Sequence, residues 1–279
     1  KKKTKKVDQI KKCDSDIVCL QEVDHFHDFY NLEFDKMGYE CIYVQKINRE
    51  EGLLTIFKKG IFTLAFQNEI MFDLKIPLKL AKNHYTRNNL CQFIQLRHNY
   101  SNKQILIANT HLYWDPRCEE VKFLQASVIL EYLSTQFSIK DNIFLCGDFN
   151  SMPSSNVIKF IEEKKAPNIS RIENIFQKRV KMTDEVIIYD LFKQKATINL
   201  KSSYSNYQGT AQHPDFTNYT QNFKGALDYI LYNTSMEDCR LIGIQPLPIN
   251  EIQKELGLPN ADYPSDHLPI TAYYEIQTN

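Results

Sequence analysis

The sequence lacks an excess of charge of either sign. Of its 279 residues, 34 are Lys or Arg and 34 are Asp or Glu, so the formal net charge is zero. A protein that holds long nucleic acid mainly by counterion release needs a basic excess. Any contact with nucleic acid is therefore expected to be local. Hydrophobic residues make up 43% and charged residues 24% of the chain, which excludes a disordered, collagenous or low-complexity protein.

The chain also lacks a run of the roughly 20 apolar residues that a membrane span needs, and it starts with KKKTKK rather than an apolar signal core. We interpret KKKTKK as a solvated charged segment rather than an RNA-binding arm. The seven cysteines contain no CxxC pair and no Cys/His cluster at zinc spacing. They are interpreted as free thiols of an intracellular protein, and the sequence leaves cytoplasm and mitochondrion open. Without a repeat or a linker, residues 1–279 are expected to form a single domain.

Short runs of β-branched and aromatic residues recur along the chain and alternate with a few helical patterns. Strands are predicted at residues 16–22, 39–45, 53–58, 62–72, 91–97, 104–112, 142–146, 226–232, 239–247 and 267–276. Helices are predicted at residues 24–37, for about five turns from residue 119, and after a cap at Ser154 or Ser155. Long loops are expected between residues 167 and 212. Burying these strands calls for an α/β fold, a two-sheet β-sandwich flanked by helices.

Polar side chains that can act in catalysis or bind a metal repeatedly occur at the end of an apolar strand. They are Glu22, His111, Asp148, Asn150, Asp228, Asp266 and His267. Each has an ordinary structural explanation: Glu22 could start a helix, and Asp148 with Asn150 could form an Asx turn. If the strand ends share one edge of the sandwich, however, the carboxylates would repel one another unless a cation lay among them.

Carboxylate and amide oxygens without thiolates favour a hard ion, so Mg²⁺ is expected, with Mn²⁺ as an alternative. The chemistry that follows is metal-assisted phosphoester hydrolysis. An aspartate can activate water and an imidazole can neutralise the charge that develops on the phosphoryl group.

The blocks DIVCLQEV, NTHLYWDP, CGDFNSMPSS, FKGALDYILY and YPSDHLPI occur in that order. With them the chain resembles the endonuclease/exonuclease/phosphatase superfamily. The third to fifth blocks, together with TNYTQNFKG, resemble the CCR4-type deadenylase branch, and most closely its 2′,5′-phosphodiesterase (phosphodiesterase 12-like) members. EGLLTIFKK adds to that closer resemblance. The resemblance implies a metal-dependent phosphodiesterase, a hydrolase that acts as a 3′-exoribonuclease on poly(A) or oligoadenylate.

The resemblance also implies a role for each residue at the strand ends. Glu22 would be the principal metal ligand, supported by Asp266. Asp148 would orient or deprotonate the attacking water, and Asn150 would hold a phosphate oxygen. His267 would bind the scissile phosphate while Asp228 orients it, and His111 would contact the same phosphate from the opposite side.

In deadenylase relatives an aromatic ring and a proline sandwich an adenine, which corresponds to Phe223 and Pro116 here. Stacking on a base contributes roughly 1–3 kcal/mol. The alternative is that Phe223 fills the core and Pro116 forms a turn. Trp114, the only tryptophan, is expected to serve as structural packing.

One block of the family pattern is not present in this sequence. Family members begin with a strand of the YNIL type whose asparagine helps to hold metal and phosphate, and no such block precedes residue 16. We expect that strand to lie upstream, because an inner strand's absence would expose apolar surface and unpaired backbone. The alternative functions are a 2′,5′-oligoadenylate phosphodiesterase, a more distant lipid or inositol phosphatase, and an inactive RNA-binding or scaffold relative.

Overall fold

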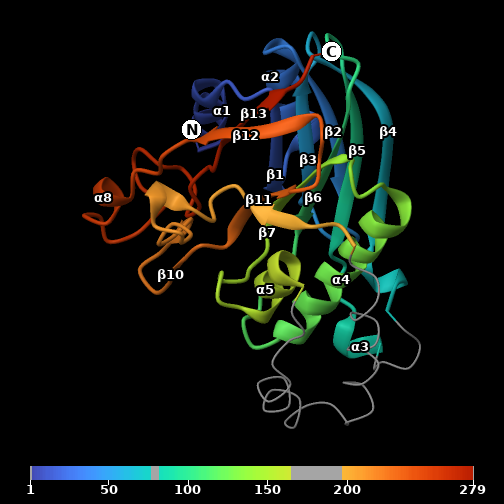
Figure 1. The fold of residues 1–279 in the computed structure, drawn as a ribbon. Coiled ribbons are helices and arrows are strands. Elements are labelled where there is room, and N and C mark those ends of the chain that lie inside the picture. Colours follow the sequence, from blue (N-terminus) through green and yellow to red (C-terminus); the bar gives the residue numbers. More distant parts are fainter. Residues whose placement is uncertain (1, 77–81, 165–196, 279) are drawn as a thin grey trace.

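The computed structural model describes residues 2–76, 82–164 and 197–278, and it has two β-sheet layers that pack face to face. Helices cover the outer faces, with α4 and α5 on one side and α1 and α2 on the other (Figure 1). The α/β sandwich that the sequence predicts is therefore confirmed.

The larger sheet has six strands in the order β4-β5-β6-β7-β11-β8. Its central pair, β6 and β7, is parallel, and every other neighbouring pair is antiparallel. The strands are β4 (Phe62–Met71), β5 (Leu90–His98), β6 (Gln104–His111), β7 (Asn142–Asp148), β8 (Leu200–Ser202) and β11 (Asp228–Asn233).

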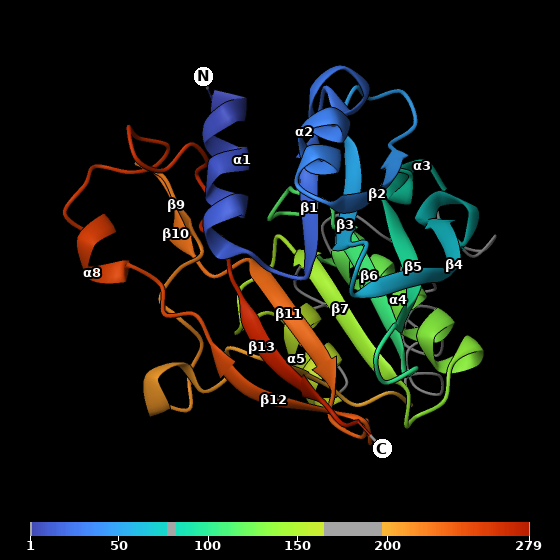
Figure 2. The same cartoon turned by 90° about the horizontal axis from the view of Figure 1, so that it is seen from above.

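The second layer contains a three-stranded sheet in the order β1-β3-β2 and a separate antiparallel pair. The sheet is formed by β1 (Ile17–Val23), β2 (Tyr39–Gln45) and β3 (Gly52–Lys58), and the pair by β12 (Cys239–Ile244) and β13 (Ala272–Ile276). A short hairpin of β9 (Asn218–Tyr219) and β10 (Lys224–Gly225) lies at the end of the molecule opposite β4 (Figure 2).

The main helices are α1 (Lys2–Cys13), α2 (Asn31–Lys36), α4 (Glu119–Gln136) and α5 (Asn156–Glu163). Shorter helical segments are η1 (Phe26–Tyr30), η2 (Phe72–Leu74), α3 (Lys82–Tyr85), η3 (Tyr207–Gly209) and α8 (Ile249–Ile252). The predicted cap of α5 is present, because the Ser155 hydroxyl accepts a hydrogen bond from the Ile158 amide at 3.2 Å.

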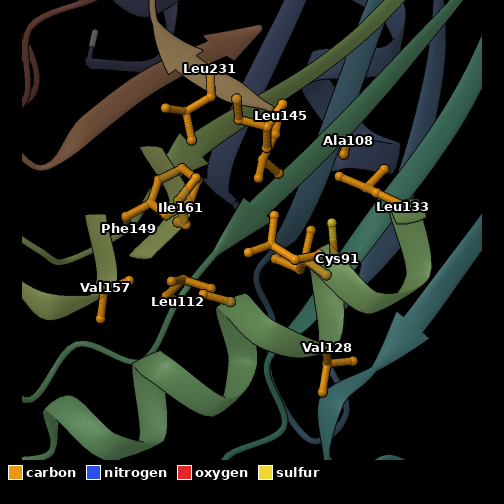
Figure 3. Close-up of a cluster of buried hydrophobic side chains, with 14 of the residues drawn as sticks. Cys91, Ala108, Leu112, Val128, Leu133, Leu145, Phe149, Val157, Ile161 and Leu231 are labelled. Carbon is orange, nitrogen blue, oxygen red and sulfur yellow. The ribbon is translucent and has the colours of Figure 1, made fainter. Parts of the chain in front are cut away.

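Strand β6 shows how the core directs side chains to the two sides of the large sheet. Leu106 and Ala108 pack with residues of α4 and α5 (Figure 3). Ile105 and Ile107 point the other way, into the core between the two sheet layers. Because side chains alternate along a strand, His111 at the end of β6 lies on the side of the second layer.

One prediction, that for the N-terminal segment, needs correction. Residues 2–6, within the KKKTKK segment, belong to helix α1 rather than to a solvated loop, and Val7 of this helix packs against the face of β1 and β3. The helix predicted at residues 24–37 is confirmed from Phe26 to Lys36, where the π-helical turn η1 continues directly into α2, and it ends before Gly38. Of the loop predicted between residues 167 and 212, residues 167–196 lie outside the described part of the structure.

A cavity of about 560 Å³ opens between β1 and β13 and extends to the end of β7. Among the described strands, β1 pairs only with β3 and β13 pairs only with β12. The cavity is lined largely by apolar side chains from both sheet layers, including Ile17, Ile107 and Tyr274. Two unpaired strand edges therefore face an apolar space next to the acidic strand ends.

All seven cysteines lie in the described part of the chain and are free thiols, as the sequence predicts. No helix among the described residues is long and apolar enough to cross a bilayer.

Candidate active site

Three of the predicted residues lie side by side at one edge of the six-stranded sheet. His111 at the end of β6 is opposite Asp148 at the end of β7, and Asp148 is opposite Asp228 at the start of β11. Gly147 allows β6 and β7 to approach closely, because a Cβ there would lie 1.9 Å from the Thr110 carbonyl oxygen. The sheet register therefore brings an imidazole and two carboxylates together.

His267 completes this group from a loop near the C-terminus. Its Nδ1 donates a hydrogen bond to Asp228 Oδ2 at 2.8 Å, and its Nε2 lies 3.9 Å from Asp148 Oδ2. A β-bridge between His267 and Asn218 positions the loop. Thr217 donates a second hydrogen bond to Asp228 Oδ2, at 2.6 Å, so the acceptor of the Asp228/His267 pair is fixed from two sides.

The environment gives the two imidazoles opposite protonation states. Burial alone would lower the pKa of His267, but the neighbouring carboxylates, Asp228 first, raise it to about 10. Burial, followed by the positive charges of Lys46 and His267, lowers the pKa of His111 to about 3. At neutral pH His267 is therefore a cation, whereas His111 is neutral.

Asp148 lies between these two histidines, with Oδ2 at 3.6 Å from His111 Nε2. Burial, followed by the charge of Asp228, raises the pKa of Asp148 to about 7. Its Oδ1 accepts the Asn150 backbone N–H at 2.8 Å, so the Asx turn considered from the sequence is present. The turn uses one carboxylate oxygen and leaves the other facing the imidazoles.

Glu22 reaches the same cavity from the end of β1. The register between β1 and β3 shifts between Leu20 and Val23, and Glu22 has a positive φ of 54°. Such a bulge redirects a side chain at the end of a strand. Burial, then the charge of Glu51, raises the pKa of Glu22, and Asp266 acts in the same direction.

The donor set fits a hard cation. Ligand atoms of Asp148, Asp228 and His267 lie within 4.8 Å of one another, and Glu22 and Asp266 add carboxylates close enough to interact electrostatically. After burial, which raises the pKa values of Glu22 and Asp148 most, the charges of neighbouring carboxylates raise them further, so the carboxylates of the cluster repel one another. A divalent ion that prefers oxygen ligands would relieve this repulsion.

The residues proposed to hold a base are on the surface. Phe223 is 42% exposed and Pro116 is exposed, so Phe223 does not fill the core. A Cβ on Gly225 would lie 2.8 Å from the Phe223 ring and 2.4 Å from Met152 Sδ, so both side chains cover this glycine. Trp114 is 63% exposed, and the prediction that it serves as structural packing is wrong.

Sequence reasoning missed two buried lysines beside the site. Lys122 of α4 donates to the Asn150 carbonyl at 2.7 Å, which holds the loop after β7. Lys46, in the loop after β2, lies 3.4 Å from His111 Nδ1. A lysine in a loop or on a helix face usually lies in solvent, so no local signal could have identified either residue.

A buried polar network between the sheet layers was also missed. Asn109 on β6 accepts a hydrogen bond from Gln21 at 2.8 Å and donates to Thr55 at 3.2 Å, and Thr55 donates to Gln92 at 2.7 Å. This network ties β1, β3, β5 and β6 together directly behind the site. It can be recognised only when the strands are paired and their faces are known.

The amino-acid sequence was compared with protein families and with characterised proteins. Residues 7–267 match the sequence profile of the Endonuclease/Exonuclease/phosphatase family. Carbon catabolite repressor protein 4 homolog 4 of Arabidopsis thaliana is 29% identical, over 96% of this chain and 68% of that protein. The CCR4-Not complex 3′-5′-exoribonuclease subunit Ccr4 of Schizosaccharomyces pombe is 27% identical, over 94% of this chain. The chain spans only 43% of the length of that second relative.

Solved structures with a similar fold include two catalytic proteins. The 2′,3′-cyclic phosphatase ANGEL2 superposes with a TM-score of 0.81 at 25% identity, covering 97% of this chain and 84% of that one. The human Nocturnin catalytic domain with bound sulfate has a TM-score of 0.71 at 22% identity, covering 99% and 86%. The similarity to CCR4-type proteins predicted from sequence is confirmed, and the closer similarity to 2′,5′-phosphodiesterases stays a prediction.

Proposed function

The chain belongs to the Endonuclease/Exonuclease/phosphatase family, and from this premise we propose that it is a divalent-metal-dependent 3′-exoribonuclease that shortens poly(A) or oligoadenylate and releases 5′-AMP. The observation that carries the proposal is the hydrogen-bonded pair of Asp228 and His267 beside Asp148. A cationic imidazole, together with a carboxyl group whose pKa is about 7, is suited to phosphoester hydrolysis at neutral pH.

Each residue at the strand ends has one role in this proposal. Asp148, with a pKa raised to about 7, takes a proton from the attacking water. Protonated His267, oriented by Asp228, binds a phosphate oxygen and neutralises charge as the bond breaks. His111 contacts the phosphate from the opposite side of Asp148, and Asn150 holds one of its oxygens.

Glu22 and Asp266 are the residues proposed to hold Mg²⁺, with Mn²⁺ as an alternative. When bound, the ion supplies Lewis-acid stabilisation of negative charge on phosphate oxygens. The repulsion between these two carboxylates supports the assignment, because a cation bound between them would relieve it.

Adenine selection is assigned to Phe223 and Pro116, which stack on the two faces of the base. The exposure of Phe223 supports this role, because a ring in the core could not reach a ligand. The zero net charge of the chain also means that recognition depends on such local contacts rather than on a general attraction to polyanions.

The proposal treats residues 1–279 as a single catalytic domain whose activity needs one further strand. The cavity between β1 and β13 has two unpaired strand edges and apolar walls. These are the surroundings that an inner strand of a sheet requires. We propose that the asparagine-bearing strand expected from the family resemblance lies there and reaches the acidic cluster.

A second candidate is hydrolysis of 2′,3′-cyclic phosphate at RNA ends. It is favoured by the similarity to ANGEL2, whose structure is described as that of a 2′,3′-cyclic phosphatase. A preference for 2′,5′-linked oligoadenylate, a more distant lipid or inositol phosphatase and an inactive, RNA-binding relative are the remaining alternatives. An inactive binding protein has no need of the acidic cluster around Asp148.

One panel of substrates separates these candidates. The longest soluble form of the protein is incubated with 3′,5′-linked oligo(A), 2′,5′-linked oligo(A) and oligo(A) ending in a 2′,3′-cyclic phosphate, each with Mg²⁺, with Mn²⁺ and with chelator. We expect 5′-AMP from the 3′,5′-linked substrate only when metal is present. Opening or loss of the cyclic phosphate without shortening of the chain would favour the second candidate. Absence of products from all three substrates would contradict the enzymatic proposal.

A further inference from the structure

Lys46 is held in place by the hairpin that connects β2 and β3. The two strands pair up to Gln45 and Gly52, and the Lys46 amide donates to the Glu51 carbonyl at 3.1 Å beyond that pair. The Gln45 side chain donates to the Arg49 carbonyl at 2.7 Å across the same loop. A side chain at Gly52 would collide with the Val44 carbonyl oxygen, 2.2 Å from an added Cβ. These contacts therefore fix the backbone conformation of the loop at Lys46.

The side chain of Lys46 is only 7% exposed, although it belongs to a loop. Its Nζ lies 3.0 Å from Glu51 Oε1 and 3.4 Å from His111 Nδ1. An ammonium group has three donors and no acceptor. In this contact His111 Nδ1 must therefore accept, which leaves the single ring proton of the neutral imidazole on Nε2.

The position of that proton matters because of what faces it. His111 Nε2 lies 3.6 Å from Asp148 Oδ2, on the side of the ring opposite Lys46. His267 has the reverse arrangement, since its Nδ1 donates to Asp228. The low pKa of His111, about 3, is consistent with a neutral ring between a fixed cation and Asp148.

We propose that Lys46 is a positioning residue that fixes His111 as the neutral tautomer with its proton on Nε2, so that Nε2–H is presented to the phosphate beside Asp148. This inference rests on the proposed function for the role of His111, but the position of the proton can be measured without any turnover. A ring with the other tautomer would direct a lone pair at the phosphate and repel it.

The first test is ¹⁵N NMR of the histidine rings in the metal-free protein at neutral pH, with His111 assigned by its loss in His111→Gln. In the wild type we expect a non-protonated Nδ1 and a protonated Nε2. In Lys46→Met the Nδ1 signal should shift towards the protonated position, because its donor is lost. Lys46→Arg should keep the wild-type pattern, because guanidinium is also a donor only.

The second test is kinetic and uses Lys59→Met as the matched control, since Lys59 pairs with Asp35 on the surface, away from the site. Lys46→Met should lower kcat roughly 10- to 100-fold, the usual loss when an outer partner of an active-site imidazole is removed. The change in KM should be small, Lys46→Arg should recover part of kcat, and Lys59→Met should match the wild type.

Two results would overturn the proposal. A protonated Nδ1 on His111 in the wild type would do so even if Lys46→Met failed to fold. An increase in KM at unchanged kcat, with the His111 signals unaltered in Lys46→Met, would mean that Lys46 binds substrate directly. If instead the tautomer changes as expected but no RNA substrate is hydrolysed by the wild type, the proposed function fails and the positioning role remains.

Discussion

Replacing Asp228 by asparagine removes one negative charge from beside His267 while keeping the size of the side chain. The oxygen at this position accepts from His267 Nδ1 at 2.8 Å and from Thr217 at 2.6 Å. An amide oxygen can accept both bonds, so the loop geometry should persist. What is lost is the charge that, after the opposing effect of burial, contributes most to raising the pKa of His267 to about 10.

The expected loss in kcat follows from the weakening of the hydrogen bond between His267 and the residue at position 228. A hydrogen bond to a charged group contributes about 1.5–3 kcal/mol, and each 1.36 kcal/mol of barrier corresponds to a tenfold change in rate. Asp228→Asn should therefore lower kcat roughly 10- to 150-fold. Because less of His267 stays protonated, the alkaline limb of the pH profile of kcat should move to lower pH.

The assay measures kcat and KM on oligo(A) across pH, and NMR titration of His267 gives its pKa directly. RNA binding should be nearly unchanged, since the substitution leaves the proposed base pocket intact. If Asp228→Asn showed the turnover of the wild type and an unchanged pKa of His267, the Asp228/His267 pair would have no part in the mechanism. A large increase in KM alone would assign Asp228 to binding instead.

Three further predictions concern metal, base recognition and pH. Glu22→Ala should abolish hydrolysis and weaken Mg²⁺ binding, measured by calorimetry, while the fold persists. As a control, substitution of the exposed Glu69 by alanine should leave Mg²⁺ binding unchanged. Unchanged Mg²⁺ affinity in Glu22→Ala would refute the ligand assignment. Phe223→Ala should weaken transition-state binding of oligo(A) by about 1–3 kcal/mol, a loss of roughly 5- to 150-fold in kcat/KM, with little effect on a small phosphodiester. Equal losses on both substrates would return Phe223 to a structural role. Since the folded pKa of His267 is raised, its contribution to the free energy of unfolding of the metal-free protein should be present below about pH 6.5 and be lost as pH rises through about 10. Urea unfolding at several pH values checks this, and Asp228→Asn should show a weaker dependence on pH.

The strand ends could be predicted from sequence because two local signals coincide there. An apolar run fixes a buried strand, and a carboxylate or imidazole directly after it can leave the core only at the sheet edge. Asp148 follows this rule at the end of β7, whereas Asp228 begins β11, and the antiparallel pairing of these two strands places both carboxylates at the same edge. The roles of the individual residues came from resemblance to a family rather than from these patterns.

Other features depend on tertiary contacts that no local pattern contains. Lys46 is buried because the β2–β3 hairpin folds over His111, and its sequence neighbours resemble an ordinary polar loop. Val7 anchors α1 although five of the first six residues are lysines, because packing on the sheet outweighs the local excess of charge. Trp114 is expected from the sequence to serve as structural packing, whereas the loop after β6 exposes it.

The most direct test of the proposed activity is the product pattern from oligoadenylate labelled at its 5′ end, digested by the longest soluble form of the protein. Stepwise shortening from the 3′ end, with 5′-AMP as the released product and no reaction in chelator, is the result that we expect. Internal cleavage, release of inorganic phosphate without shortening, or equal rates with and without a divalent ion would contradict a metal-dependent 3′-exoribonuclease.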